Sequence, residues 1–176
     1  MTKLKDSQTL RQKLKGDLAT LLGTLDDLDV EDAQAFVKWT CKKANIYRKA
    51  LIENTFSNLP ENMCQGDIVL CDLGVNIPPE FSDIRTGKHF VIYWAQQGHN
   101  VIVIPITRKC HDSNNDFLIP IGKIDGLSDE ENYIKLDSIR SVSLHRISRI
   151  SGNKAGKIHS DIIVNIVKEN MKKLFI

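Results

Sequence analysis

The hydrophobic period of this chain changes once, near Gly66, and this change limits what the chain can fold into. Up to about residue 55, apolar residues recur every three or four positions, as they do along one face of an amphipathic helix. After Gly66 they fall in short runs rich in β-branched and aromatic side chains, which Gly, Pro, Asn and Asp separate. Helices followed by several short strands predict an α+β protein.

The first part of the chain predicts a helical hairpin. Its leucines follow the spacing of one helix face, at Leu14, Leu18, Leu21, Leu25 and Leu28. Aspartates at 26, 27 and 29 interrupt this pattern, and acidic residues suit a helix N-terminus, so a second helix should begin near Asp29. That helix has an apolar stripe of its own, formed by Val37, Cys41, Ala44, Tyr47 and Leu51.

The second part predicts a compact β-barrel or sandwich followed by a helix. The expected strands cover residues 67–73, 89–95, 100–107, 117–121 and 133–144. Pro105 and Pro120 lie inside two of these runs, which predicts edge or bulged strands there. The chain ends in an amphipathic helix that Ser160 and Asp161 can cap.

Composition and charge narrow the possible partners. The 176 residues are 41% hydrophobic and 26% charged, which is typical of a globular protein. The net charge of +2 excludes a strongly basic coat for nucleic acid. Residues 140–176 nevertheless hold eight basic side chains against two acidic ones. We therefore expect any site for a polyanion to draw on the C-terminal third.

The cysteines indicate whether the protein binds a metal and in which compartment it lies, and the apolar runs indicate whether it enters a membrane. The four cysteines lack the spacing of metal ligands and read as reduced thiols, so we expect a cytoplasmic protein with no metal and no cofactor. The longest apolar runs are too short to span a bilayer, and we expect no membrane partner.

Four blocks of sequence resemble the PemK/MazF family of bacterial toxins, in the family's own order. Residues 66–74 (GDIVLCDLG) resemble the opening GD-I-V-x-x-D-L strand. Residues 79–81 (PEF) and 87–92 (GKHFVI) resemble S-E-Q … G-x-R-P-V-L-V. Residues 103–107 (VIPIT) resemble V-x-P-[IV]-T, and 134–142 (IKLDSIRSV) resemble V-x-x-D-Q-x-R-T-I-D. The resemblance implies a small SH3-like barrel of the PemK/MazF/CcdB type at 61–176, with a hairpin extension at 1–58.

The resemblance also implies a function. Members of this family act as homodimeric, sequence-specific endoribonucleases that cleave single-stranded mRNA without a metal, and a cognate antitoxin protein neutralises them. The ribose 2′-OH attacks the adjacent phosphate, which leaves a 2′,3′-cyclic phosphate and a 5′-OH end. This reaction needs a base for the 2′ proton, a cation beside the phosphorane and an acid for the leaving oxygen.

The resemblance provides a candidate for each task. His89 can serve as acid or base, as histidine side chains commonly do. Lys88 or Arg85 can neutralise the phosphorane, and Thr107 can donate to a phosphate oxygen. Asp137, with Lys135 two residues earlier, matches an acid/base and cation pair of the Kid branch. The RNA-binding candidates are Glu80, Phe81, Arg85, Lys135, Ser138 and Arg140. Each residue also has a plain structural interpretation, as a surface histidine, a solvated loop charge or a strand-ending threonine.

Two departures from the family pattern leave a second function open. The Arg that precedes Pro in the family is replaced by Lys88-His89, and the loop between Glu80 and Lys88 is longer. The alternative is therefore a catalytically impaired barrel that binds protein or RNA, or a gyrase poison like CcdB.

The helical hairpin has three open interpretations. It is a structural appendage that buries its stripe on the barrel, an oligomerisation element that uses the leucine stripe, or a segment that acts in cis on the toxin site. Under the third interpretation, deleting residues 1–55 raises ribonuclease activity.

Overall fold

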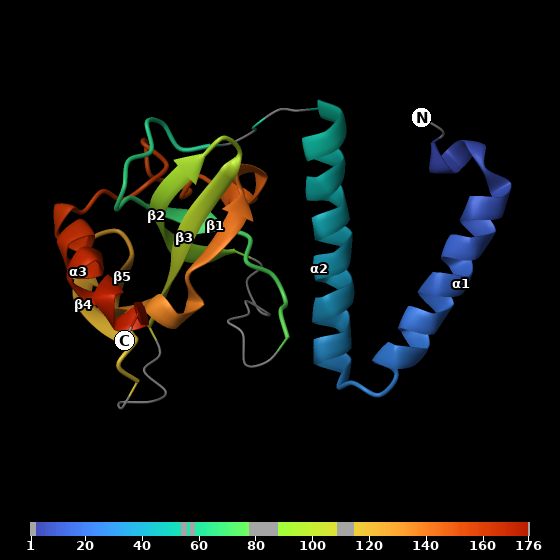
Figure 1. Cartoon of the computed structure of the whole chain (residues 1–176), viewed down its shortest axis with the longest axis horizontal. Helices are drawn as coiled ribbons and strands as arrows, with labels where there is room; N and C mark the ends of the chain where they lie inside the picture. The colour runs from blue at the N-terminus through green and yellow to red at the C-terminus, as the bar shows by residue number, and fades with distance from the viewer. Residues whose placement is uncertain (1–2, 54–55, 57–58, 78–87, 109–114, 176) are drawn as a thin grey trace.

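The N-terminal part is the expected helical hairpin. A computed structural model describes residues 3–53, 56, 59–77, 88–108 and 115–175. After a short 3₁₀ turn (Leu4–Asp6), α1 spans Gln8–Leu25 and α2 spans Val30–Arg48, followed by a π turn at Lys49–Glu53. Ser7 caps α1, because its side chain accepts a hydrogen bond from the Leu10 N–H at 3.3 Å. Asp29 is the N-cap residue of α2, as expected. Figure 1 shows α2 between the sheet and α1.

The second part forms an antiparallel sheet with a helix after it. The strand order is β4-β5-β3-β2-β1-β7, and β6 also pairs with β3. A 3₁₀ turn at Leu136–Ser138 divides the predicted strand 133–144 into β5 and β6, and a second one at Leu144–Arg146 precedes β7. The strands are β1 (Ile68–Cys71), β2 (His89–Gln97), β3 (Asn100–Thr107), β4 (Leu118–Ile124), β5 (Ser128–Lys135), β6 (Arg140–Ser143) and β7 (Ile147–Ser148). The C-terminal helix α3 spans Asp161–Met171, and a 3₁₀ turn (Lys172–Phe175) follows it.

The sheet turns at β3, which changes partners along its length. β3 pairs with β6 over residues 100–103 and with β5 at Ile106 and Thr107. Pro105 lies between these two ladders, opposite Val91 of β2, so the strand that carries it is central and the edge prediction is wrong there. Pro120 is on β4, at the end of the strand order and beside a register shift, as predicted.

The architecture confirms the α+β class, with N-terminal helices, an antiparallel sheet and a C-terminal helix. The predicted closed SH3-like barrel is not confirmed. Among the described strands, β4 and β7 stand at opposite ends of the order, and no ladder joins them.

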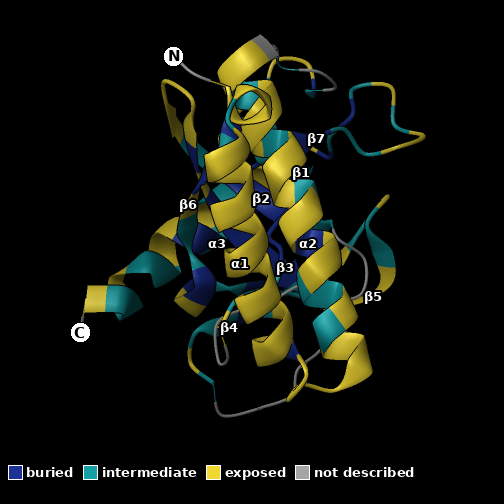
Figure 2. Ribbon diagram, turned by 90° about the vertical axis from the view of Figure 1, so that its right-hand side faces the viewer, coloured by how far each residue is buried: buried dark blue, intermediate teal, exposed yellow. Residues whose placement is uncertain are grey.

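Residues that alternate along the strands form two cores on opposite sides of the sheet. One core, which we call the isoleucine core, contains Ile68, Ile92, Ile104 and Ile134 together with Ile163 and Val167 of α3. The other, the valine core, contains Val69, Val91, Val101, Val103 and Val142. Figure 2 shows the buried residues gathered in the strands, whereas α1 is exposed along almost all of its length.

The hairpin meets the sheet through α2, but with a different face from the one predicted. Trp39 is only 8% exposed, and its ring lies so close to Gly74 that a Cβ there would be 2.1 Å from it. The Arg146 guanidinium stacks over the same ring at 4.9 Å. Lys42 and Ile46 follow on this face, one and two turns later, and both are half-buried.

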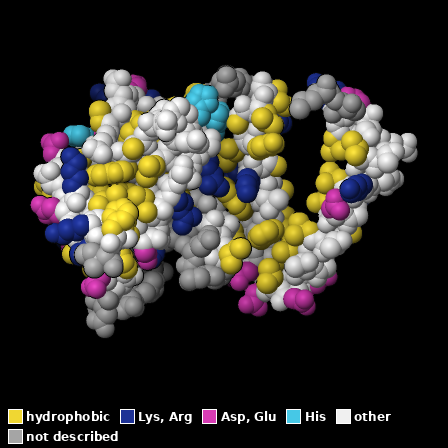
Figure 3. All heavy atoms as spheres, viewed as in Figure 1, with side chains coloured by type: hydrophobic (Ala, Val, Ile, Leu, Met, Phe, Trp, Pro, Cys, Tyr) yellow, Lys and Arg dark blue, Asp and Glu magenta, His cyan; other side chains and the backbone are white. Residues whose placement is uncertain are grey.

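The predicted apolar stripes are largely exposed. Val37, Tyr47 and Leu51 of the second stripe face away from the core, and so do Leu14 and Leu18 of the first. Figure 3 shows hydrophobic side chains on the facing sides of α1 and α2. The interpretation that the hairpin buries its stripe on the sheet domain is therefore wrong. A single tryptophan and its neighbours make the contact instead.

Candidate functional site

Three strand ends bring several of the predicted site residues to one edge of the sheet. His89 begins β2, Thr107 ends β3 and Lys135 ends β5. The register Val91↔Pro105 places the start of β2 beside the end of β3, and Thr107 itself pairs with Tyr133 of β5. Because side chains alternate along a strand, His89 and Thr107 share the face of the valine core.

His89 is half-buried and has a defined tautomer when neutral. Its Nε2 is hydrogen-bonded to the backbone carbonyl of Ile106. A carbonyl oxygen only accepts, so Nε2 carries a proton, and Nδ1 is the nitrogen that can gain or lose one.

A second group forms around the 3₁₀ turn between β5 and β6. The Lys135 Nζ donates to both carboxylate oxygens of Asp137, at 2.9 and 2.7 Å. The Ser138 hydroxyl donates to Asp137 Oδ1 at 3.1 Å, and the Arg140 Nε donates to the Ser138 carbonyl at 3.2 Å. The turn thus places one cation and a hydroxyl on the Asp137 carboxylate, and a second cation on the Ser138 carbonyl. Cations of this kind can stabilise an anionic transition state.

Lys88 lies in a different environment from this group. It is half-buried and lines a pocket of about 280 Å³ between α2 and the sheet. Asp72 and Lys42 line the same pocket and form an ion pair that joins the sheet to α2. The candidates Glu80, Phe81 and Arg85 lie outside the described residues.

Charged groups that the sequence analysis did not select surround the end of β1. Arg146 is half-buried, and burial lowers the pKa of its guanidinium despite the opposite effects of Cys71 and Asp72. Burial also raises the pKa of Cys71 to about 12, which excludes this thiol as a nucleophile at neutral pH. Asp72 belongs to the first family-like block and Arg146 to the basic third, so the sequence carried a weak signal for both.

Two histidines that were not among the predicted site residues pack around one phenylalanine ring. The Phe56 ring lies 4.7 Å from that of His99 and 4.5 Å from that of His145, centroid to centroid. Burial lowers the pKa of His145, and the neighbouring His99 lowers it further. No pattern in the sequence links these three positions, which are far apart along the chain.

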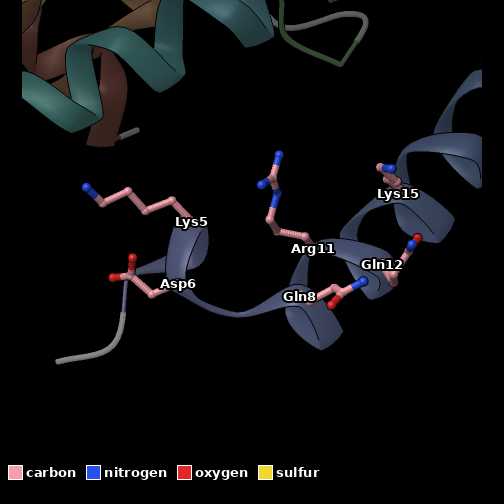
Figure 4. A pocket seen from close by; sticks show the side chains of 6 residues that line it. All are labelled: Lys5, Asp6, Gln8, Arg11, Gln12 and Lys15. Atoms are coloured by element: carbon pink, nitrogen blue, oxygen red, sulfur yellow. The ribbon is translucent and has the colours of Figure 1, made fainter.

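The remaining candidate sites offer less support for a function. Within the described residues, no three His, Cys, Asp or Glu side chains are placed to hold a metal ion, and no described helix combines the length and apolarity needed to cross a membrane. A hollow of about 510 Å³ lies at the start of α1, and Figure 4 shows the side chains that line it, among them Lys5, Arg11 and Lys15. All six lining residues are exposed, so this hollow lacks the buried polar groups of a specific site.

Comparison with known proteins identifies one family. The family model described as "PemK-like, MazF-like toxin of type II toxin-antitoxin system" matches residues 64–175. The match begins just before β1 and ends after α3, so both helices of the hairpin lie outside it. No curated protein matches the chain.

Proposed function

This chain belongs to the PemK-like, MazF-like toxin family of type II toxin–antitoxin systems, and we propose that it is a sequence-specific endoribonuclease that cuts single-stranded mRNA. Toxins of this family are generally endoribonucleases, and they have an antitoxin partner and typically form dimers. We extend this to a homodimer that its cognate antitoxin neutralises, with the toxin unit at 61–176 and the hairpin at 1–58 as a separate extension.

The observation that supports this proposal is the convergence of His89 and Thr107 on one sheet edge, together with the Lys135–Asp137 pair beyond β5. We assign the base to Asp137, whose carboxylate takes the proton from the ribose 2′-OH as the 2′ oxygen attacks phosphorus. We assign the acid to His89, which gives a proton from Nδ1 to the 5′ oxygen as the P–O5′ bond breaks. The products are a 2′,3′-cyclic phosphate and a 5′-OH.

The remaining residues hold the phosphate. Lys135 and Arg140 supply positive charge to the phosphorane, and the Thr107 hydroxyl donates to a non-bridging oxygen. Ser138 fixes the Asp137 carboxylate through its hydrogen bond of 3.1 Å. We place Lys88 at a neighbouring phosphate, and we assign RNA binding to Glu80, Phe81 and Arg85.

The test is cleavage of a mixed mRNA by the purified full-length chain in EDTA, followed by analysis of the ends. We expect 5′-OH and 2′,3′-cyclic phosphate ends. His89→Ala and Asp137→Asn should each lower the single-turnover rate by about 10²–10³-fold. Asp129→Asn is the matched control, since Asp129 is an exposed residue of β5. Intact RNA, or 5′-phosphate ends, would contradict the proposal.

One observation favours a second candidate, a barrel that binds RNA or protein without cleaving it. Lys88-His89 stands where the family pattern has the Arg that precedes Pro, and Lys88 lines a pocket together with Asp72 and residues of α2. Under this alternative the wild-type chain binds RNA or a protein partner but leaves RNA intact, and His89→Ala changes neither property.

A further inference from the structure

The pocket between α2 and the sheet has the chemistry of a binding site, and the family match covers only part of its lining. Its walls come from the end of α2 and the π turn after it, from the linker, from the 3₁₀ turn at Leu144–Arg146, from β7, and from the residues that flank β1 and β2. The hairpin residues are Lys42, Asn45 and Ile46 of α2 and Lys49 of the π turn. Since the family model begins at residue 64, this half of the pocket is specific to the extended chain.

Two buried polar atoms in this pocket lack a partner. Among the described residues, nothing is hydrogen-bonded to the Nε2 of His145 or to the Oγ of Ser148. Ser148 is 7% exposed, and both residues line the pocket. A buried polar group without a hydrogen bond costs about 1–3 kcal/mol, so each of these atoms needs a water molecule, an ion or a ligand group to satisfy it.

The charges and walls indicate the class of ligand. Three lysines and one aspartate line the pocket, so its lining carries more positive than negative charge; the lysines are Lys42, which pairs with Asp72, Lys49 and Lys88. Figure 3 shows Lys, Arg and His side chains gathered along the boundary between the sheet and α2. Apolar side chains of Ile46, Leu59, Leu144 and Ile147 complete the walls, and the Phe56 ring adds an aromatic face. A site for a nucleotide needs positive charge for the phosphate, and it needs apolar or aromatic walls and polar atoms for the base. The lining of this pocket offers each of these.

We propose that this pocket binds one nucleotide, with its phosphate at Lys49 and Lys88 and its base between the apolar walls, within reach of His145 and Ser148. Its size of about 280 Å³ lies at the lower end of the range for small ligands. Lys88 is next to His89 in the chain, so the pocket adjoins the site at the sheet edge. The nucleotide therefore belongs to the strand being cut or is a free mononucleotide. The first source rests on the proposed function.

The experiment measures binding separately from cleavage, on the full-length chain. The probe is a fluorescent 2′-O-methyl RNA oligonucleotide, which lacks the attacking hydroxyl, and its Kd is followed by anisotropy as salt is varied. Lys49→Ala should weaken binding about 5- to 10-fold and reduce the slope of log K against log salt by about 0.7, the value for one phosphate contact of a single strand. Lys43→Ala is the matched control, because Lys43 is an exposed α2 residue outside the pocket.

The variant Ser148→Ala distinguishes a serine that binds ligand from one that has only a structural role. Removing an unpartnered buried hydroxyl should leave the free protein as stable or more stable, yet reduce its stabilisation by ligand. Each 5′-mononucleotide at millimolar concentration serves as the second probe, with thermal unfolding as the measurement.

The outcomes separate the two sources and the two proposals. Loss of oligonucleotide affinity in Lys49→Ala supports a strand nucleotide, even if wild-type protein cleaves nothing. The free nucleotide is supported if a mononucleotide stabilises the protein, Ser148→Ala reduces this stabilisation, and Lys49→Ala leaves oligonucleotide binding unchanged. If Lys49→Ala binds RNA as wild type does and no mononucleotide stabilises the protein, the pocket assignment is wrong, whereas the cleavage proposal stands or falls on its own assay.

Discussion

The substitution Asp67→Asn tests the ion cluster that holds α3 to the sheet. Asp67 precedes β1 and is fully buried, and its carboxylate accepts three hydrogen bonds. The donors are the Cys64 N–H at 2.6 Å, Lys157 Nζ at 2.7 Å and His159 Nδ1 at 2.7 Å. Between these two basic residues, Ile158 exchanges backbone hydrogen bonds of 2.8 and 3.0 Å with Ile68. The cluster therefore fixes the segment that leads into α3.

The expected cost follows from the burial of this pair. Asn keeps the shape of Asp but removes the charge, which leaves the Lys157 ammonium, only 14% exposed in its side chain, without its counter-ion. Breaking a buried ion pair costs about 3–5 kcal/mol, and because the Asn amide oxygen can still accept one of the bonds we expect about 3 kcal/mol. For a chain of this size that lowers the melting temperature by roughly 6–12 °C.

Urea unfolding at pH 6, followed by circular dichroism, measures this change. Asp161→Asn is the control, since Asp161 also bonds His159, at 3.0 Å, but its side chain is 94% exposed, and the expected cost is below about 0.5 kcal/mol. The double variant Asp67→Asn/Lys157→Met should lose less than the sum of the two single variants, because the second change removes the stranded charge. A cost below about 1 kcal/mol for Asp67→Asn at unchanged m-value would refute the reasoning.

The remaining predictions concern pH, one glycine and the thiols. Hydrogen bonds to Asp67 and Asp161 raise the pKa of His159. The stabilising contribution of His159 is therefore complete below pH 6.5 and is lost as the pH rises through the higher pKa of the folded state. The urea midpoint should fall from about pH 6 to about pH 8 in the wild type, and it should fall less in His159→Gln. Burial acts to raise the pKa of Asp67, but the bonds from Cys64, Lys157 and His159 outweigh it and lower that pKa, so this contribution is present above about pH 4 and is lost in acid. Gly74→Ala should cost about 2 kcal/mol or more in urea unfolding, because φ is +80° there and the new methyl group would meet Trp39, whereas Gly98→Ala, with a similar φ of +58° and open space, should cost less. Cys71 should resist thiol reagents in the native protein while the exposed Cys41 and Cys64 react, as mapped by mass spectrometry; early labelling of Cys71 would contradict its burial.

Local patterns in the sequence were sufficient for the elements themselves. The run 100–107 forms β3 with the predicted bounds, and α2 begins after Asp29 as its acidic start indicated. Both cases depend on short-range physics: β-branched residues fit a strand, and a carboxylate suits a helix N-terminus. The run 133–144 failed as a single strand, since its mix of apolar and polar residues resembles one long strand and gives no sign of the turn at Leu136–Ser138. That turn gathers Lys135, Asp137 and Ser138.

Long-range packing was not predictable in this way. The stripe that includes Val37 and Tyr47 is a regular apolar pattern, yet the sheet takes the adjacent face with Trp39. The reason is shape: Gly74 leaves room for an indole ring, and Arg146 supplies a cation above it. Neither feature can be read from the helix alone, because both partners come from distant parts of the chain.

The docking of α2 also bears on the Lys88-His89 departure from the family pattern. In a chain without the hairpin, Lys88-His89 in place of the family's arginine would be a simple loss of a planar, bidentate cation. In this chain the hairpin brings Lys49 to the pocket that Lys88 lines, whereas Lys42 is paired with Asp72. Under the pocket proposal, a phosphate there is held by the two point charges of Lys49 and Lys88 instead of one guanidinium. On this proposal the Lys88-His89 departure and the hairpin are linked, as two parts of one anion site.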